Sequence, residues 1–523
     1  MLRELPEEQL KVSNMRKISI LLIFLILLLF VMACSTSSNT LYKKGAVLND
    51  NRVFYEIFVP SFYDSDQDQV GDFRGIIEKL DYLNKNNSSK DLGVTGIWLM
   101  PVMQSPSYHK YDVQSYYSVD PSYGTIEDFK ALTVECKKRD IALIIDLPIN
   151  HSSSLNPWFI ASCNNDEYYR DYYNFSPVYK SGYHKSPVSD EYYEGHFSSS
   201  MPDFNLDSEK VRAEILKICQ FWIKQGVSGF RLDAVSHFYE GNQEKNVEFL
   251  SWLFENLKEM KEDIYLVGEA WESESVILKL YESNIPSLFN FPFSQSTGLL
   301  ISSIRTSSGS YLSTRLESWY STLSSKNIDA PFLTNHDQTR SAGALSGNEN
   351  FTKMAASLYL LLPGNPFIYY GEEIGMKGGG DSDENKRTQF IWSIKENTKG
   401  MCLPPAGAVP RDIEEGEAEQ SKDKDSLLSF YRKVIQIKNE NPGLSEGSFK
   451  ALDFSNPGIC AYKMENENKN YIVIHNLDSE KNVEINNLDY SEKIGILSCT
   501  GEKVYLDNTS ANLPPLSTIV LVE

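Results

Sequence analysis

The sequence predicts an α/β fold: a (β/α)8 TIM barrel with a small domain inserted after the third strand and an antiparallel β domain at the C-terminus. Three short apolar stretches, at 229–233, 264–269 and 331–337, each end on a carboxylate. Such stretches are typical of buried parallel strands, and helix-length segments separate them. In a barrel the carboxyl ends of the strands meet on one face, where barrel enzymes carry their active sites. We therefore expect the three carboxylates to meet on that face.

The first half of the barrel is predicted from alternating apolar and helical patterns. The segments are three strands over 53–60, 94–101 and 141–147, and a helix over 73–84. The next strong helix, 208–225, begins only after an interval rich in Tyr, Ser, Asn and Pro. This interval is too long for an ordinary loop between a strand and a helix. An inserted domain over 152–206 is therefore expected.

The second half of the chain predicts five more barrel strands and a separate β domain. Strands four and five end at Asp233 and Glu269, and the remaining three are predicted over 286–291, 330–335 and 366–371. A loop (396–424) and an amphipathic helix (425–441, capped by Asp425-Ser426) follow, and then the short alternating strands 472–474, 483–485 and 518–522. The predicted domains are a barrel over 52–151 and 207–443, the insert, and a β domain over 444–523.

The N-terminus resembles a bacterial lipoprotein signal. The apolar run 18–33 follows Arg16-Lys17 and is shorter than the roughly 20 residues that a spanning helix needs. Residues 1–33 are predicted to be a signal peptide, with translation starting at Met15. Cys34 is predicted to receive the lipid, and 34–51 to form a tether. The protein would then be exported and lipid-anchored at the cell envelope. The alternative is an uncleaved membrane anchor.

Composition excludes several partners. The chain has 523 residues, of which 41% are hydrophobic and 23% charged, and its formal net charge is -21. Nucleic acid and anionic membrane surfaces would repel it, whereas a neutral substrate would not. The six cysteines after Cys34 show no C-x-x-C spacing, which argues against a zinc or redox motif and favours buried free thiols. We expect a monomer.

Four ordered motifs carry a family resemblance. They are Asp146-Leu-Pro-Ile-Asn-His151, Gly229-Phe-Arg-Leu-Asp-Ala-Val235, Gly268-Glu-Ala-Trp271 and Thr334-Asn-His-Asp-Gln338. In this order they resemble the signatures of the α-amylase family, glycoside hydrolase family 13, over roughly residues 50–523. The resemblance implies a TIM barrel with an inserted domain after strand three, and cleavage of an α-glucan.

The resemblance also implies the catalytic residues. Asp233 would be the nucleophile, Glu269 the general acid/base, and Asp337 a fixed acid that holds the distorted sugar. Glu269 must be protonated at rest, so its pKa should be raised by neighbouring carboxylates and partial burial. Arg231 lies on the same strand face as Asp233 and can neutralise and orient it. In a retaining enzyme the carboxyl groups of Asp233 and Glu269 lie about 5–5.5 Å apart.

Five further residues are implied to bind the sugar. His151 and His336 match histidines that hydrogen-bond sugar hydroxyls, and His237 matches a residue near the leaving group. Tyr111 would stack on the sugar ring, since aromatic rings suit apolar sugar faces, and Asp112 would accept its hydroxyl hydrogen bonds.

An acidic loop suggests a calcium ion. Hard cations bind several oxygens, and residues 64–72 place carboxylates at every second position. The same segment in oligo-1,6-glucosidase-like relatives binds calcium, which implies as ligands Asp64, Asp66, Asp68, the Val70 carbonyl and Asp72. The alternative is a solvated acidic loop. Asn150 resembles a ligand of a second calcium site, for which the sequence assigns no partners.

The segment 201–206 and residue 234 indicate which activity within the family is expected. Residues 201–206 (Met-Pro-Asp-Phe-Asn-Leu) resemble the signature of a subfamily between oligo-1,6-glucosidases and neopullulanases, several of whose members are α-amylases. Ala234 follows the nucleophile where α-1,6-specific relatives tend to carry Val, which favours α-1,4 bonds. The sequence thus predicts endo-acting hydrolysis of α-1,4-glucans. Ser236 and Lys110 depart from the usual residues, so an α-glucosidase or a glucan-transferring enzyme stays an alternative.

A non-catalytic role is the remaining alternative. Amylase-like barrels without activity exist in the heavy subunits of amino-acid transporters, and a surface glucan-binding protein is also conceivable. Loss of any one of the three acids would favour such a role. All three are present, together with Arg231 and two histidines, which favours an enzyme.

Overall fold

The computed structural model describes residues 51–85, 90–378, 382–395, 399–409, 413–466 and 469–523. The predicted signal peptide, the predicted lipid-receiving Cys34 and all of the tether except its last residue lie outside the described residues. Among the described helices, none has the length and apolarity required to cross a bilayer.

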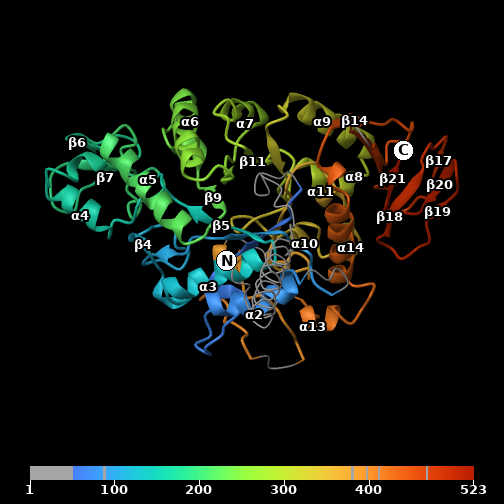
Figure 1. The fold of residues 1–523 in the computed structure, drawn as a ribbon, viewed down its shortest axis with the longest axis horizontal. Coiled ribbons are helices and arrows are strands. Elements are labelled where there is room, and N and C mark those ends of the chain that lie inside the picture. Colours follow the sequence, from blue (N-terminus) through green and yellow to red (C-terminus); the bar gives the residue numbers. More distant parts are fainter. Residues whose placement is uncertain (1–50, 86–89, 379–381, 396–398, 410–412, 467–468) are drawn as a thin grey trace, which may run out of the picture. The chain divides into compact units, whose positions relative to one another are not determined.

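Eight parallel strands form the predicted barrel (Figure 1). The strands are β1 (Phe54–Ile57), β2 (Gly96–Leu99), β5 (Ala142–Leu147), β9 (Gly229–Leu232), β10 (Tyr265–Gly268), β11 (Ser287–Phe289), β12 (Ile328–Ala330) and β13 (Phe367–Tyr369). They pair in the order β12-β11-β10-β9-β5-β2-β1-β13. The ring closes between β12 and β13, where Phe367 N donates to Pro331 O at 2.9 Å. The predicted TIM barrel is confirmed.

Helices alternate with these strands along the chain. The larger ones are α2 (Phe73–Leu83), α3 (Ile126–Lys138), α5 (Glu209–Lys224), α6 (Gln243–Met260), α7 (Glu274–Tyr281), α8 (Leu299–Thr306), α9 (Gly309–Thr322), α11 (Glu349–Leu360) and α14 (Leu427–Glu440). Side chains cap several of them: Asp72 accepts from Gly75 N at the start of α2, and Ser426 from Ser429 N at the start of α14. Their apolar sides are buried, which fixes the loops at the strand ends.

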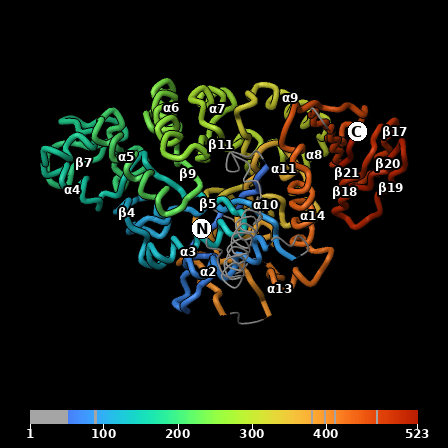
Figure 2. Tube along the Cα trace, viewed as in Figure 1, coloured from blue at the N-terminus to red at the C-terminus, as the bar shows by residue number. Residues whose placement is uncertain are grey.

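The insert and the C-terminal domain are both built from antiparallel sheets. In the insert, β6 (Phe175–Ser176), β8 (Tyr192–Glu194) and β7 (Tyr183–Lys185) follow α4 (Pro157–Cys163), and the tube in Figure 2 shows this excursion before the chain re-enters the barrel through α5. The C-terminal strands are β14 (Ser448–Ala451), β15 (Ile459–Glu465), β16 (Tyr471–Asn476), β17 (Val483–Asn486), β18 (Glu492–Ser498), β19 (Tyr505–Leu506), β20 (Ser510–Leu513) and β21 (Ser517–Val522). They form a five-stranded and a three-stranded sheet. The predicted architecture is confirmed.

Two predicted elements are wrong. The seventh strand was expected over 330–335, but β12 ends at Ala330. Pro331 has no N–H to donate, which interrupts the strand, and beyond it Phe332 forms only an isolated bridge with Phe367. Asp337 therefore lies on a loop rather than at a strand end. The predicted loop 396–424 contains the short helix α13 (Glu417–Gln420), in which Glu419 accepts from Gly416 N at 3.0 Å.

A buried carboxyl shortly after β13 makes stability depend on pH. Glu372 accepts hydrogen bonds from Tyr359 Oη at 2.6 Å and Tyr431 Oη at 2.9 Å, and burial raises its pKa from 4.5 to about 8. Its stabilising contribution is complete below pH 4.5 and is lost as the pH rises through about 8. Glu372→Gln cannot ionise, so its free energy of unfolding should exceed that of the wild type by about 2 kcal/mol at pH 9. Denaturant titrations at pH 5 and 9 test this.

The exposed Glu480 provides the matched control, because Glu480→Gln makes the same chemical change outside the core. A Glu372→Gln variant whose advantage does not grow between pH 5 and 9 would contradict the raised pKa.

Candidate active site

A single buried guanidinium joins three carboxylates at the carboxyl ends of neighbouring strands. Arg231, on β9, contacts Asp146 Oδ1 at 2.8 Å and Asp233 Oδ1 at 2.6 Å through Nη1. Its Nη2 contacts Glu269 Oε2 at 3.0 Å. Gly229 lets β9 and β10 approach closely, since a Cβ there would lie 1.8 Å from Tyr265 O. Because both terminal nitrogens of the Arg231 guanidinium are used, this one side chain fixes the positions of Asp233 and Glu269 relative to each other.

The backbone turns sharply directly after Asp233. Ala234 has a φ of 49°, in the left-handed region that non-glycine residues seldom adopt. Its N–H donates to Glu269 Oε2 at 3.2 Å, so the turn ties the ends of β9 and β10 together. Such local strain is typical of functional sites.

Glu269 is suited to hold a proton. Burial raises its pKa above the ordinary 4.5, Arg231 opposes this, and the nearby charges of Asp233 and Asp337 raise it further. A raised pKa favours the protonated form, which a general acid needs. The direction of this shift is the one predicted from the sequence.

Asp337 belongs to a second charged group beside the first. His336 lies between two carboxylates, with Nδ1 2.6 Å from Glu56 Oε1 and Nε2 3.1 Å from Asp337 Oδ2. Arg387 Nη2 contacts Asp337 Oδ1 at 2.7 Å. Burial would lower the pKa of His336, but Asp337 and Glu56 together raise it to about 10. Burial would raise the pKa of Asp337, but His336 and Arg387 hold it well below the ordinary value. Asp337 is thus a fixed anion.

Two of the predicted sugar-binding residues, Tyr111 and Asp112, are placed very differently. The Tyr111 hydroxyl donates to Asp146 Oδ2 at 2.9 Å and lies 2.7 Å from His336 Nε2, which links the two charged groups. Asp112 is outside this network: its Oδ1 accepts from the hydroxyls of Ser105 and Ser107. Their roles toward a sugar stay predictions.

His151 and His237 flank an exposed aromatic ring that sequence reasoning missed. Phe197, from the insert, has its ring centroid 5.5 Å from that of His151 and 5.6 Å from that of His237, and it is 47% exposed. His151 is buried, and its Nε2 has no hydrogen-bond partner among the described residues. His237 Nδ1 lies 2.7 Å from Glu240 Oε2. Because buried polar groups are normally hydrogen-bonded, this unpartnered ring nitrogen is available to bind a ligand.

Glu56 and Arg387 were also missed. Glu56 is the only charged residue within the buried strand β1, and this was a usable signal, because a buried carboxylate needs a partner. Arg387 follows Asp337 by 50 residues in a segment without a motif. Only the folded chain places its guanidinium on Asp337.

The acidic loop brings together three of its four predicted carboxylate ligands. Asp64, Asp66 and Asp72 each offer an oxygen, and these oxygens lie within 4.8 Å of one another. Asp68 is not part of the group; its Oδ1 accepts from Val70 N at 2.8 Å. The Val70 carbonyl stays a predicted ligand. Three carboxylate oxygens at this spacing form a hard donor set that suits Ca²⁺ better than softer metals.

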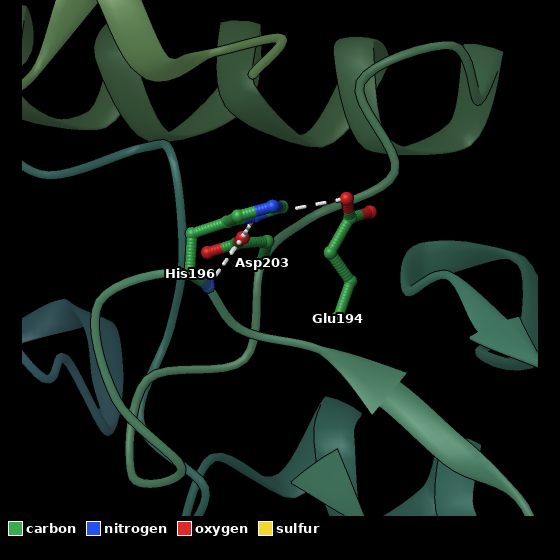
Figure 3. Close-up of side chains that lie close together, drawn as sticks. All are labelled: Glu194, His196 and Asp203. Carbon is green, nitrogen blue, oxygen red and sulfur yellow. Dashed lines mark hydrogen bonds and ion pairs between the residues drawn. The ribbon is translucent and has the colours of Figure 1, made fainter. Parts of the chain in front are cut away.

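A second group of possible ligands lies in the insert. The ligand atoms of Glu194, His196 and Asp203 are also within 4.8 Å of one another. Figure 3 shows His196 between the two carboxylates, with Nδ1 2.8 Å from Asp203 Oδ2 and 3.7 Å from Glu194 Oε1. The Asp203 hydrogen bond raises the pKa of His196. Asn150 Nδ2 donates to Asp203 Oδ1 at 3.2 Å, so Asn150 touches this group, and its role as a calcium ligand stays a prediction.

The chain matches two families. Residues 56–447 match the family described as alpha amylase, catalytic domain. Residues 459–520 match the alpha-amylase SusG C-terminal domain.

Individual relatives agree with these matches. Alpha-amylase 3 of Dictyoglomus thermophilum is 39% identical over 486 residues, which are 90% of this chain and 93% of the relative. A 4-alpha-glucanotransferase of Thermotoga neapolitana is 31% identical over 440 residues, or 81% of this chain and 95% of the relative. The structure of Eubacterium rectale Amy13B superposes with a TM-score of 0.87 at 39% identity and covers 91% of this chain and 96% of its own.

Proposed function

The chain belongs to the α-amylase family of glycoside hydrolases, and from this we propose that it cleaves internal α-1,4-glucosidic bonds in starch- and glycogen-type glucans with retention of configuration. The observation that carries the proposal is the contact of one guanidinium, Arg231, with both Asp233 and Glu269. Two carboxyl groups held this close suit direct attack by one and proton transfer by the other.

Each charged group has a step in the proposed reaction. Glu269 donates its proton to the glycosidic oxygen while Asp233 attacks the anomeric carbon, which forms a glycosyl-enzyme and releases the first product. Glu269, now ionised, takes a proton from water, and that water displaces Asp233. Asp337 and the paired His336 provide fixed charges beside the oxocarbenium-like centre.

Two observations support hydrolysis of α-1,4 bonds. Ala234 leaves more space after the nucleophile than the valine of α-1,6-specific relatives, and a relative named as an α-amylase is 39% identical. The alternative is glucan transfer, which the 31% identity to a glucanotransferase favours.

Product analysis tests the proposal. The purified chain is incubated with soluble starch, maltotriose and isomaltose. A ladder of oligosaccharides from starch supports the endo-α-1,4 hydrolase. Glucose alone, mostly from the short sugars, would make it an α-glucosidase, and products longer than the added maltotriose would make it a transferase.

Phe197 is expected to contribute to substrate binding. A half-exposed aromatic ring beside His151 and His237 offers an apolar face to a sugar ring. Phe197→Ala should lower kcat/KM for maltotriose about tenfold, mainly through a higher KM. Tyr179→Ala, at another exposed aromatic of the insert, is the control and should change neither constant. A loss confined to kcat in Phe197→Ala would contradict a binding role.

We also propose a calcium ion held by Asp64, Asp66 and Asp72, which would neutralise a loop that otherwise repels itself. Both Asp64 oxygens accept backbone N–H groups, from Asp66, Gln67 and Gln69, so the loop is already folded around this carboxylate. At a free calcium concentration 100 times Kd, binding should add about 2.7 kcal/mol to the free energy of unfolding.

Chelation by EDTA is therefore expected to lower Tm, and added calcium to restore it. Asp64→Ala should abolish the difference between the calcium and EDTA measurements, whatever its own Tm. Asp489→Ala, at an exposed acid of the C-terminal domain, should keep the difference. Equal Tm values for the wild type in calcium and EDTA would contradict the proposed calcium site.

Membrane attachment through Cys34 is proposed on the sequence pattern alone. In a bacterial host the wild type should partition into the detergent phase of a Triton X-114 extract, and Cys34→Ser into the aqueous phase. Identical partition of both would contradict lipidation.

A further inference from the structure

A groove lies where the first turn of α9 meets the loop between β14 and β15. It encloses about 440 Å³, and its lining includes Ser308, Ser310, Tyr311, Thr314, Asp453 and Asn456. Figure 1 shows α9 beside β14. None of the catalytic or sugar-binding residues described above lines it, so the groove is separate from the candidate active site.

The two walls of the groove are fixed to each other. Ser310 N donates to Pro457 O at 3.1 Å, and Ala461 N donates to Ser313 Oγ at 2.9 Å. Gly309 permits the close approach, because a Cβ there would lie 2.4 Å from the carbonyl carbon of Ile459. A preformed groove loses little conformational freedom when it binds a ligand.

Its chemistry suits a neutral polyhydroxylated ligand. The Tyr311 side chain is 57% exposed and offers an aromatic face. Asp453 Oδ1 accepts from Ser455 N and Asn456 Oδ1 from Gly458 N, which orients both side chains. The second side-chain polar atom of each has no hydrogen-bond partner among the described residues, so both are available to hydroxyl groups. The lining includes a carboxylate but no cationic side chain, which excludes phosphorylated and other anionic ligands.

We propose that this groove is a second α-glucan site, which holds a polymer chain while the active site cleaves it. Tyr311 stacks on the apolar face of a glucose unit, and Asp453 and Asn456 bind its hydroxyls. Since α9 leads back to the start of β12, its first turn lies toward the barrel face on which the strands end, the face of the catalytic carboxylates. The inference rests on the proposed function, because that function supplies the polymer.

Granular starch and maltotriose separate the groove from the active site. Binding to starch granules is measured by depletion, in full-length chains that also carry Asp233→Asn so that the granules are not digested. Adding Tyr311→Ala should weaken this binding about fivefold. With the catalytic residues intact, Tyr311→Ala should lower the ratio of kcat/KM on granular starch to kcat/KM on maltotriose by a similar factor.

Two further variants keep the test decisive. Asn456→Ala removes a groove hydrogen bond without touching the aromatic ring and should also weaken granule binding. Tyr505→Ala, at a 61% exposed tyrosine outside the groove, should leave binding and the activity ratio unchanged. Unchanged granule binding in both groove variants would overturn the second site, even if the wild type digests starch. Granule binding that depends on Tyr311, combined with no starch digestion by the wild type, would support the groove and contradict the proposed function.

Discussion

Asp233→Asn is expected to lower kcat on soluble starch by about 10⁴-fold or more, because the amide cannot attack the anomeric carbon and no covalent intermediate forms. The amide oxygen can still accept from Arg231 Nη1, which now contacts Asp233 Oδ1 at 2.6 Å, so the fold should persist. Steady-state kinetics and thermal unfolding of the same preparation separate the two effects.

Asp190→Asn is the matched control, since it makes the same change at an exposed aspartate paired with Lys185. Asp233→Gly with added azide extends the test, because azide can enter the space left by the carboxylate. A retaining enzyme should then form a glycosyl azide of inverted configuration. An Asp233→Asn variant that keeps more than a few per cent of kcat would show that another group is the nucleophile.

Arg231→Lys is expected to be the second most damaging change. The wild-type guanidinium contacts Asp146, Asp233 and Glu269 together, and it is fully buried. A lysine ammonium is a single point charge that cannot reproduce this fork, so at least one buried carboxylate loses its partner. We expect a loss of about 3–5 kcal/mol in the free energy of unfolding. We also expect kcat/KM to fall about 100-fold or more, because the nucleophile and the acid lose their relative placement.

The pH profile gives an independent readout. Arg231 opposes the rise in the pKa of Glu269, so weakening its contact should raise that pKa further and shift the alkaline limit of activity to higher pH. Arg212→Lys is the control, because Arg212 also pairs with a carboxylate through both Nη atoms, at 2.9 and 3.0 Å from Glu248, but this carboxylate is 56% exposed. It should cost less than about 1 kcal/mol. Equal effects of the two lysine variants would contradict the role of Arg231.

The barrel and the placement of Arg231, Asp233 and Glu269 at strand ends could be predicted from the sequence, because these depend on local order. Each barrel strand is a short apolar stretch whose burial is encoded residue by residue, and Asp233 and Glu269 follow directly on their strands. Arg231 and Asp233 are two residues apart in an extended strand, so their shared face follows from the period of the strand. The strand predicted over 330–335 ends earlier, at Ala330, because Pro331 lacks an N–H and interrupts it, a constraint that the apolar pattern hides.

Only the tertiary structure decided which charges meet. Glu56 and Arg387 reach His336 and Asp337 from opposite ends of the barrel sequence, and the ring closes only where β13 joins β12 and β1. The same holds for Asp64, Asp66 and Asp72, which converge without Asp68, and for Tyr311, which lines one groove with Asn456. A side-chain contact depends on packing and on rotamers chosen by distant neighbours. Sequence spacing carries that information within one strand or helix turn, and loses it once the chain has passed through a loop.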